Sequence, residues 1–258
     1  MIDVHSHLLP GLDDGSRSME QSVGVLRHFI ADGVTDVVLT PHLVASDISR
    51  RGEEAIERRD LVLEDLRRNA PPGIRLHPGF EIMLDVPLPE YAISDRRYAI
   101  AGSRYYLVEF PNSLGPHPAG GVLQQIIRSG ITPLVAHPER YHMCSARDLS
   151  AWCAAGAVLQ VDATTLMRSN SRGAMARRLV TDGLATIMAA DNHGDGRSML
   201  LGRRYLEERG GKIAAEWLTT ANPQAILEDK ETSRVPPSPV RLKPGERVRG
   251  WIRAVAEG

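Results

Sequence analysis

The sequence has few cysteines, no long apolar run and almost no net charge, and each of these absences excludes a class of protein. Two cysteines, Cys144 and Cys153, among 258 residues cannot build a disulfide framework, so we expect a protein of the reducing cytoplasm. No segment approaches the roughly 20 apolar residues of a membrane span. The start of the chain carries Asp3 and no basic segment, which argues against a secretory signal. A formal net charge of -1 gives no electrostatic reason to expect nucleic acid as a partner.

The sequence also lacks two kinds of loop with which many enzymes bind phosphate. A cysteine-dependent phosphatase needs an arginine six positions after its nucleophilic cysteine. Ser150 stands at that spacing from Cys144, and Leu159 stands at that spacing from Cys153. No glycine-rich loop of the dinucleotide-binding or P-loop type is present. Any phosphate chemistry must therefore rest on other residues.

Short apolar runs alternate with amphipathic stretches along most of the chain, which is typical of parallel strands joined by helices. Several of the amphipathic stretches end at a glycine, the usual stop signal of a helix. The sequence predicts strands at Ile2–His5, Asp36–Thr40, Ile74–Leu76, Tyr106–Glu109, Leu134–Ala136, Val158–Val161 and Ala185–Ala189. It predicts helices at Met19–Asp32, Glu53–Arg68, Gly120–Ser129, Ala146–Ala155, Arg172–Thr181 and Asn222–Leu227.

Histidines and acids stand at or just after the carboxyl ends of these predicted strands. In a barrel all such ends meet on one rim, whereas in an open sheet only the strands at the switch point converge. The number of polar strand ends therefore favours an α/β barrel of seven strands. After residue 232 the composition changes to a proline-rich segment and a basic stretch, so we expect a barrel over 1–232 and a C-terminal tail over 233–258. The polar residues concerned are His5, His7, His42, Glu81, Glu109, His137, Asp191 and His193.

The spacing of these residues suits metal binding. His5 and His7 alternate along a strand and so point to the same side, where both imidazoles can bind one ion. The turn at Asp13 and Asp14 offers two more carboxylates; it also fits a simple Asp-Gly turn before a helix cap. Five histidines and several carboxylates exceed what one zinc ion takes. Imidazole and carboxylate without thiolate suit manganese, iron or zinc.

The boxes Thr40-Pro41-His42, Gly79-Phe80-Glu81-Ile82, His137-Pro138-Glu139-Arg140-Tyr141 and Asp191-Asn192-His193, together with His5-Ser6-His7, resemble the polymerase and histidinol phosphatase (PHP) superfamily. Asp13-Asp14-Gly15 and the His-Pro-Glu-Arg-Tyr box resemble, within it, the manganese-dependent protein-tyrosine phosphatases of bacterial capsule and exopolysaccharide synthesis. The resemblance extends from Met1 to about Leu227. It implies a distorted, TIM-like PHP barrel of seven strands.

The resemblance further implies a trinuclear metal centre. One ion would be held by His5, His7, Glu81 and Asp191, a second by Glu81, Glu109 and His137, and a third by Asp14, His42 and His193. Arg140 and Arg197 match arginines that contact the phosphate, and His42 is a candidate proton donor to the leaving group. The implied reaction is attack on phosphorus by a hydroxide shared between two metal ions, most simply Mn²⁺. The implied substrate is phosphotyrosine in a protein, and the family suggests the tail of a bacterial tyrosine kinase.

Three alternatives stay open at this point. A phosphatase of the same superfamily can act on histidinol phosphate or another small phosphate ester. A metal-dependent amidohydrolase also begins with His-x-His, but such enzymes commonly bridge their ions with a carboxylated lysine, and no lysine ends a predicted strand here. A scaffold without activity is disfavoured because unpaired buried acids would destabilise it.

Overall fold

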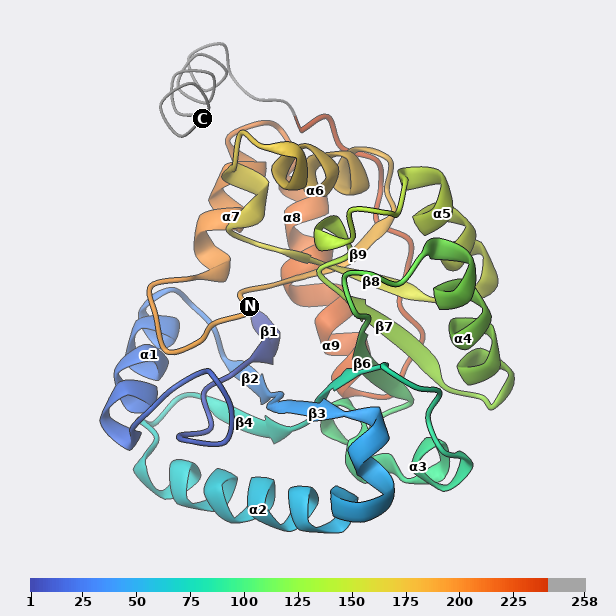
Figure 1. Ribbon diagram of the computed structural model, residues 1–258. Helices are drawn as coiled ribbons and strands as arrows, with labels where there is room; N and C mark the ends of the chain where they lie inside the picture. The colour runs from blue at the N-terminus through green and yellow to red at the C-terminus, as the bar shows by residue number, and fades with distance from the viewer. Residues whose placement is uncertain (241–258) are drawn as a thin grey trace, which may run out of the picture.

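The computed structural model describes residues 1–240, in which parallel strands form the centre and helices cover them (Figure 1). One sheet has the order β1-β2-β4 and the other the order β3-β5-β6-β7-β8-β9, and every pairing is parallel. The strands are β1 (Ile2–Ser6), β2 (Asp36–Leu39), β3 (His42–Val44), β4 (Arg75–Pro78), β5 (Glu81–Met83), β6 (Tyr105–Glu109), β7 (Thr132–Ala136), β8 (Val158–Asp162) and β9 (Ala185–Ala189).

Two strand positions are split, and the split accounts for the difference between the nine segments of the described chain and the seven predicted strands. β3 follows β2 after Thr40 and Pro41, and β5 follows β4 after Gly79 and Phe80. Pro41 has no N–H to give to a ladder. A Cβ at Gly79 would lie 2.9 Å from Val38 Cγ1, so the chain passes close to its neighbour there. The two short continuations, β3 and β5, were not predicted from the sequence.

β1 and β9 come together at their carboxyl ends and complete the ring of strands. The N–H of Asp191 donates to the carbonyl of His5 at 3.1 Å, and the N–H of His7 donates to the carbonyl of Asn192 at 2.8 Å. The seven predicted strand positions and their parallel order are confirmed. The arrangement is a distorted, barrel-like α/β fold.

The helices lie outside the strands, and each predicted helix is present with slightly different ends. Gly33, Gly130 and Gly183 follow predicted helices with positive φ values, as the stop signals indicated. α3, α7 and α8 were not predicted. The helices are α1 (Met19–Ala31), α2 (Ile48–Asn69), α3 (Glu90–Ser94), α4 (Pro116–Arg128), α5 (Ala146–Ala155), α6 (Ser171–Thr181), α7 (Met199–Glu207), α8 (Lys212–Glu216) and α9 (Asn222–Leu227).

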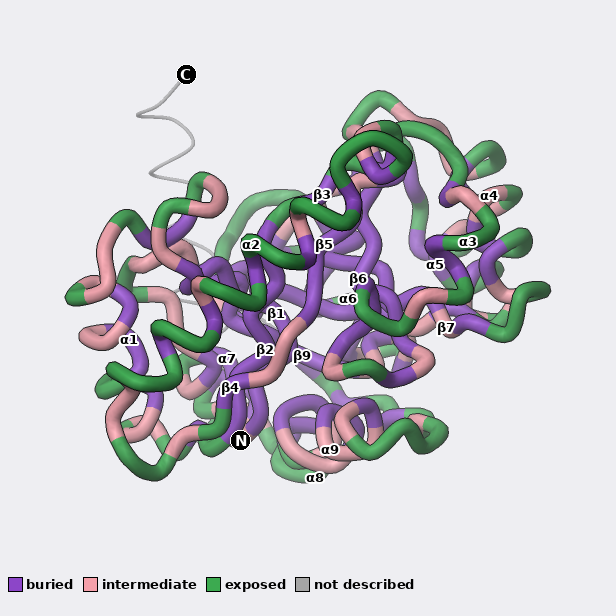
Figure 2. The backbone as a smooth tube through the Cα atoms, turned by 90° about the horizontal axis from the view of Figure 1, so that it is seen from below, coloured by how far each residue is buried: buried purple, intermediate pink, exposed green. Residues whose placement is uncertain are grey.

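The core has an inner and an outer part. Figure 2 shows the buried strands surrounded by helices whose outer faces are exposed. Inside the ring, Val4, Leu107 and Leu134 pack with Ile226 of α9, which covers the end of the ring opposite the polar strand ends. Outside it, side chains of the strands pack against the apolar faces of the helices. Burial of this kind is the main force that fixes the strand ends in place.

The predicted boundary at residue 232 stays a prediction. Residues 233–240 pack on the barrel, where Val235 and Val240 are buried and the N–H of Val240 donates to Thr181 Oγ1 at 3.3 Å. The basic stretch that follows lies outside the described residues. Within residues 1–240, no helix has the length and apolarity needed to cross a membrane. The cytoplasmic location stays a prediction.

Candidate metal centre

The structure brings all nine predicted metal-binding residues together at the carboxyl ends of the strands. His5 lies in β1, His42 in β3, Glu81 in β5 and Glu109 in β6, while the others lie in the segments just after their strands. His5, His7, Glu81 and Asp191 are fully buried, and Asp14 and His42 face solvent. The groups therefore extend from the interior of the barrel to its mouth.

The innermost group consists of His5, His7, Glu81 and Asp191. The Nε2 atoms of His5 and His7 lie 3.1 Å apart. Glu81 Oε2 lies 3.2 Å from the first and 3.3 Å from the second, and Asp191 Oδ1 lies 3.4 and 3.5 Å from them. Ligands about 2.0–2.1 Å from a tetrahedral ion lie roughly 3.3 Å apart. These separations are the ones expected of atoms that surround one metal ion.

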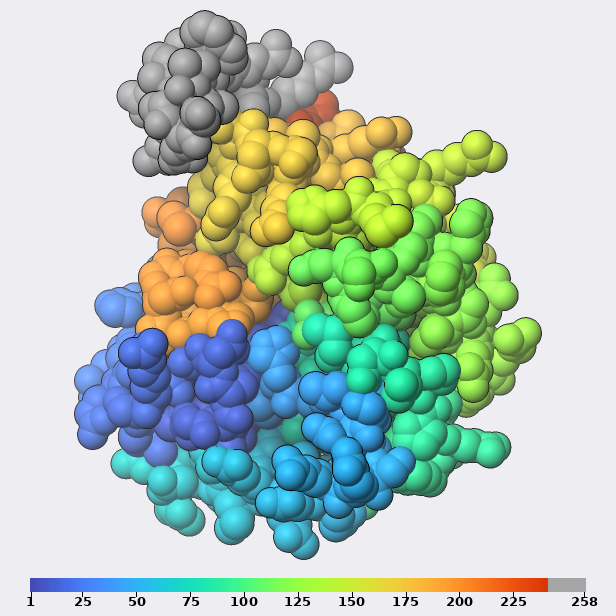
Figure 3. All heavy atoms as spheres, in the orientation of Figure 1, coloured from blue at the N-terminus to red at the C-terminus, as the bar shows by residue number. Residues whose placement is uncertain are grey.

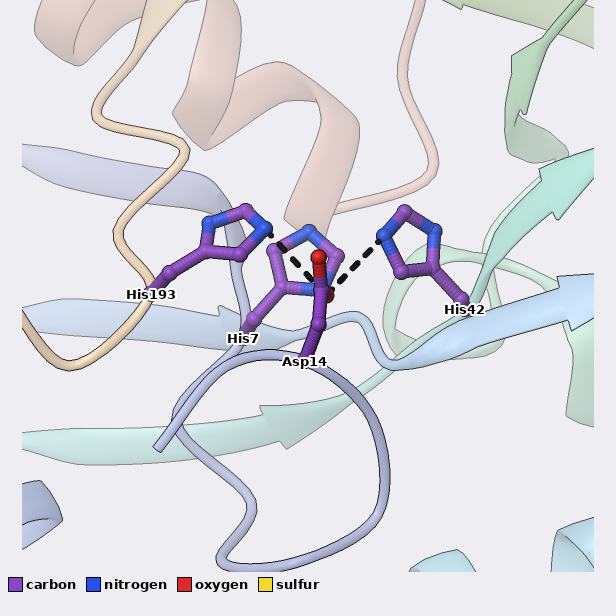
Figure 4. Close-up of side chains that lie close together, drawn as sticks. All are labelled: His7, Asp14, His42 and His193. Atoms are coloured by element: carbon purple, nitrogen blue, oxygen red, sulfur yellow. Dashed lines mark ion pairs between the residues drawn. The ribbon is translucent and has the colours of Figure 1, made fainter. Parts of the chain in front are cut away.

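The outermost group lies at the mouth. His42 Nε2 and His193 Nε2 lie 3.4 and 3.5 Å from Asp14 Oδ1. Figure 4 shows both imidazoles turned toward this carboxylate, with His7 beside it. One ligand atom from each of the four residues lies within 4.8 Å of the others, which is close enough for a single ion.

Glu81 connects the inner group to a third one. Its Oε1 lies 2.9 Å from His137 Nε2, and its Oε2 lies 3.1 Å from His42 Nδ1. Glu109 Oε1 lies 3.3 Å from the same His42 nitrogen, and Glu109 Oε2 lies 3.9 Å from His137 Nε2. Oε1 of Glu81 thus faces His137, while Oε2 faces both the inner group and His42, so the carboxylate lies between the two groups as a bridging ligand would. His42 presents Nδ1 to this group and Nε2 to the outermost one, a double contact that the sequence did not indicate.

The hydrogen bonding of this centre is incomplete without a cation. Glu81 Oε2 and His137 Nδ1 are buried and make no hydrogen bond within the described residues. Burial alone would lower the pKa of His5, but the carboxylates of Glu81 and Asp191 outweigh it and raise that pKa to about 9. Burial would likewise raise the pKa of Asp191, but the neighbouring imidazoles and Arg140 hold it well below its ordinary value. The donor set therefore attracts positive charge and fits divalent metal ions.

Asp13 and Gln160 orient the two buried imidazoles of the inner group. Asp13 Oδ2 lies 2.7 Å from His7 Nδ1 and accepts the N–H of His42 at 3.1 Å. Gln160 Oε1 lies 2.9 Å from His5 Nδ1. Each contact leaves the Nε2 atom directed to the centre, the usual arrangement of a metal-binding histidine. Asp13 thus faces away from the centre and Asp14 faces it, a choice that the residue pattern left open and that the family resemblance made for Asp14.

Two arginines border the inner group, and Asp191 links them to it. Arg140 Nη2 contacts Asp191 Oδ2 and lies 3.1 Å from Asp162 Oδ2, and Arg197 Nη1 lies 3.4 Å from Asp191 Oδ2. The oxygen Oδ1 of Asp191 faces His5 and His7. A phosphate at this border can meet both guanidinium groups while it touches the edge of the centre.

Glu139 lies next to Arg140 but is turned into the protein. It accepts the N–H of Asp162 at 2.8 Å, and its other oxygen is buried without a hydrogen bond. Burial and the nearby Asp162 raise the pKa of Glu139 to about 8, so this acid is largely protonated at neutral pH.

Gln160 and Asp162 were not predicted as residues of the site. Both interrupt the apolar run of β8 at alternate positions, and this pattern could have identified them.

Backbone strain marks two of the site residues. His137 has a φ of 31° and Asp191 a φ of 49°, values that L residues rarely adopt. Strain of this kind persists where the surrounding structure fixes a side chain for function. The four histidines left out of the predicted site lie elsewhere: His77 pairs with Asp36, and His28, His117 and His142 are exposed.

Comparison with known proteins agrees with this geometry. Tyrosine-protein phosphatase YwqE of Bacillus subtilis is 25% identical over 94% of this chain and 98% of its own length. Tyrosine-protein phosphatase CpsB of Streptococcus pneumoniae is 26% identical over 89% of this chain and 99% of its own length. A solved structure from a study of these two proteins, described there as unique metal-dependent tyrosine phosphatases, matches with a TM-score of 0.77 and 25% identity, over 94% of this chain and 100% of its own.

More distant likeness is confined to the fold. An organophosphorus hydrolase variant from Deinococcus radiodurans matches over 88% of this chain with a TM-score of 0.53 at 13% identity. The family model for capsular polysaccharide synthesis proteins of the CpsB/CapC type matches residues 1–228, nearly the whole described chain. The resemblance inferred from the sequence is confirmed, and this chain belongs to the CpsB/CapC family of capsular polysaccharide synthesis.

Proposed function

We propose that this protein is a metal-dependent phosphatase that removes phosphate from phosphotyrosine in a protein of capsule or exopolysaccharide synthesis. The observation that carries the proposal is the contact of Arg140 and Arg197 with Asp191, because it places two cations that could bind phosphate at the edge of the candidate metal centre. The names of the relatives and the family match support the tyrosine-directed activity and the biological setting.

The proposed metal is Mn²⁺, in two or three positions, with Fe or Zn as alternatives. His5, His7, Glu81 and Asp191 would hold one ion; Glu81, Glu109 and His137 a second; and Asp14, His42 and His193 a third. The geometry of the inner and outermost groups supports this assignment. In the second group the short contact of His42 Nδ1 with Glu109 adds a further nitrogen to the donor set. Imidazole and carboxylate ligands without a thiolate suit manganese.

Bound ions would supply the nucleophile by acidifying a water molecule and would offset the charge of the phosphate. Arg140 and Arg197 would hold the phosphoryl oxygens in place, and Asp162 would fix Arg140 from the opposite side. His42 is the more exposed of the two imidazoles that contact Asp14, 34% against 18% for His193, and without the third ion it would be suited to give a proton to the leaving oxygen. Burial lowers the pKa of His42, but Glu109 and Glu81 raise it overall. A tyrosyl oxygen needs little such help because a phenol has a pKa of about 10.

The proposed substrate protein is the tail of a bacterial tyrosine kinase that controls polysaccharide export. The test is to strip the protein of metal, add Mn²⁺, and compare a phosphotyrosine peptide with a phosphoserine peptide and histidinol phosphate. We expect the phosphotyrosine peptide to be hydrolysed much faster. Equal rates on all three would refute the tyrosine-directed function, and a preference for histidinol phosphate would identify a small-molecule phosphatase.

The same preparation tests the metal mechanism. Burial raises the pKa values of Cys144 and Cys153 to about 11, so neither thiol is reactive at neutral pH. We expect chelation to abolish activity and thiol alkylation to leave it unchanged. A Cys144→Ala/Cys153→Ala variant is the matched control and should retain full activity. Loss of activity on alkylation alone would refute a metal-based mechanism.

A further inference from the structure

The loops that follow β7 and β8 meet beside the metal centre and form a rim of basic and apolar side chains. Arg172 lies in the first turn of α6, and its Nη2 lies 3.3 Å from Nε2 of His142, which stands two residues beyond Arg140. Met143 and Met167 are 59% and 38% exposed on the same loops. In Figure 3 the yellow-green segment that follows β7 and the yellow segment that follows β8 adjoin on the front face. We define the basic rim as His142, Met143, Met167, Arg168 and Arg172.

The positive charge of the basic rim is not used within the protein. Among residues 1–240, neither Arg168 nor Arg172 forms an ion pair with a carboxylate. Some exposed arginines do pair, as Arg97 does with Glu53 and Asp95, whereas others, such as Arg27 and Arg128, form no ion pair among the described residues. Solvated surface arginines are common, so charge alone would mean little. Here Arg168 lies in the loop that follows β8, and Arg172 lies in the first turn of α6, a helix that contacts the segment containing Arg140.

The apolar part of the rim favours a polypeptide over a small ester. Methionine is flexible and polarisable, and exposed methionines are common on surfaces that bind varied peptides. A polypeptide that presents a phosphotyrosine at Arg140 must continue across the mouth, because the segment 138–140 contacts α6, which carries Arg172. Arg168 and Arg172 would then face the residues next to the phosphotyrosine.

We propose that the basic rim binds acidic residues that flank the phosphotyrosine of a polypeptide substrate. This inference rests on the proposed function and adds the charge of the preferred sequence to it. Guanidinium groups bind carboxylates with charge-assisted hydrogen bonds. Because Arg168 is exposed and Arg172 is only partly buried, the attraction is screened by salt and acts on capture of the substrate more than on the chemical step.

The test compares two phosphotyrosine peptides that differ in having glutamate or glutamine at the flanking positions, with p-nitrophenyl phosphate as a substrate without flanks. The rim variant is Arg168→Gln/Arg172→Gln in the manganese-loaded full chain. The control is Arg27→Gln/Arg128→Gln, which removes the same charge from exposed positions on α1 and at the end of α4. Exposed charge pairs contribute little each, so we expect the KM of the glutamate peptide to rise about fivefold in the rim variant at low salt.

The wild type and the control should prefer the glutamate peptide, and the rim variant should lose this preference with kcat and p-nitrophenyl phosphate hydrolysis unchanged. A preference that survives in the rim variant, or no preference in the wild type, would overturn the basic rim as a substrate-binding surface. An equal loss on p-nitrophenyl phosphate would overturn it too, because the arginines would then act on the phosphate itself. Failure to hydrolyse either peptide, with p-nitrophenyl phosphate still cleaved, would instead refute the proposed function.

Discussion

Replacement of Asp13 by asparagine tests how the protein prepares His7 for metal binding. Asp13 Oδ2 receives two contacts, His7 Nδ1 at 2.7 Å and the N–H of His42 at 3.1 Å, and Oδ1 accepts the N–H of Gly15 at 3.0 Å. An asparagine can keep its oxygen toward His7 and His42, but its amino group then faces the N–H of Gly15. The opposite orientation places a donor against His7 and favours the tautomer that carries a proton on Nε2, which cannot bind metal.

Either orientation also removes the negative charge that makes the imidazole a stronger ligand. Loss of such a partner typically weakens metal affinity 10- to 100-fold, which corresponds to about 1.4–2.7 kcal/mol. We therefore expect Asp13→Asn to bind Mn²⁺ at least tenfold more weakly in a competition titration with a metal-sensitive dye. Activity at saturating Mn²⁺ should largely recover, because Asp13 does not reach the substrate.

The control is Asp65→Asn, which makes the same change at an exposed position of α2. Asp14→Asn should differ from both, because Asp14 faces His42 and His193 directly and is proposed as a ligand. An unchanged Mn²⁺ affinity in Asp13→Asn would refute the orienting role. So would a loss of activity that saturating metal does not restore.

Three further predictions follow from the charges of the site and the barrel. Because the pKa of His5 is raised to about 9 in the metal-free protein, Mn²⁺ must displace its proton at pH 7. Titration calorimetry in buffers of different ionisation enthalpy should record this proton release, and the affinity for Mn²⁺ should rise toward pH 9. An affinity for Mn²⁺ that does not depend on pH would contradict the assignment of His5 as a ligand. The pKa of Asp36 is lowered because Arg75 and His77 outweigh burial, so its carboxylate stabilises the fold above its unfolded pKa near 4. Asp36→Asn should lower the free energy of unfolding by about 2 kcal/mol at pH 7, and the difference from wild type should shrink as the pH falls through the lowered pKa. A difference that stays constant with pH would count against a stabilising role of these ion pairs. Arg140→Ala should lower kcat about 10²- to 10³-fold with bound metal retained, as judged by elemental analysis, and an unchanged kcat would remove Arg140 from the phosphate site.

The sequence predicted the fold well because its signals were local and repeated. Apolar runs that end in histidine or an acid indicated the strands, and glycines such as Gly33 and Gly130 indicated the helix ends. The short strands β3 and β5 were not predicted, because three residues that follow a proline or a glycine are too few to show a periodic pattern. The splits at Pro41 and Gly79 become visible only when neighbouring strands are in place.

The residues of the site and, through the family resemblance, their grouping around three ions were predicted, but the contacts within and between the groups were not. Alternation along β1 was enough to place His5 and His7 side by side. No sequence pattern indicates that His42 presents one nitrogen to each of two groups, or that Asp13 turns toward His7 while Asp14 turns toward the mouth. Those choices depend on the distances between loops that are far apart in the chain, and so on the packing of the whole barrel.

The most direct test of the account is crystallography of the protein loaded with Mn²⁺ and soaked in inorganic phosphate, with anomalous scattering used to locate the manganese. The account predicts at least two ions at the carboxyl ends of the strands, with Glu81 between them, and a phosphate in hydrogen-bond contact with Arg140 and Arg197. Manganese bound away from Glu81, or a phosphate that touches neither arginine, would contradict it.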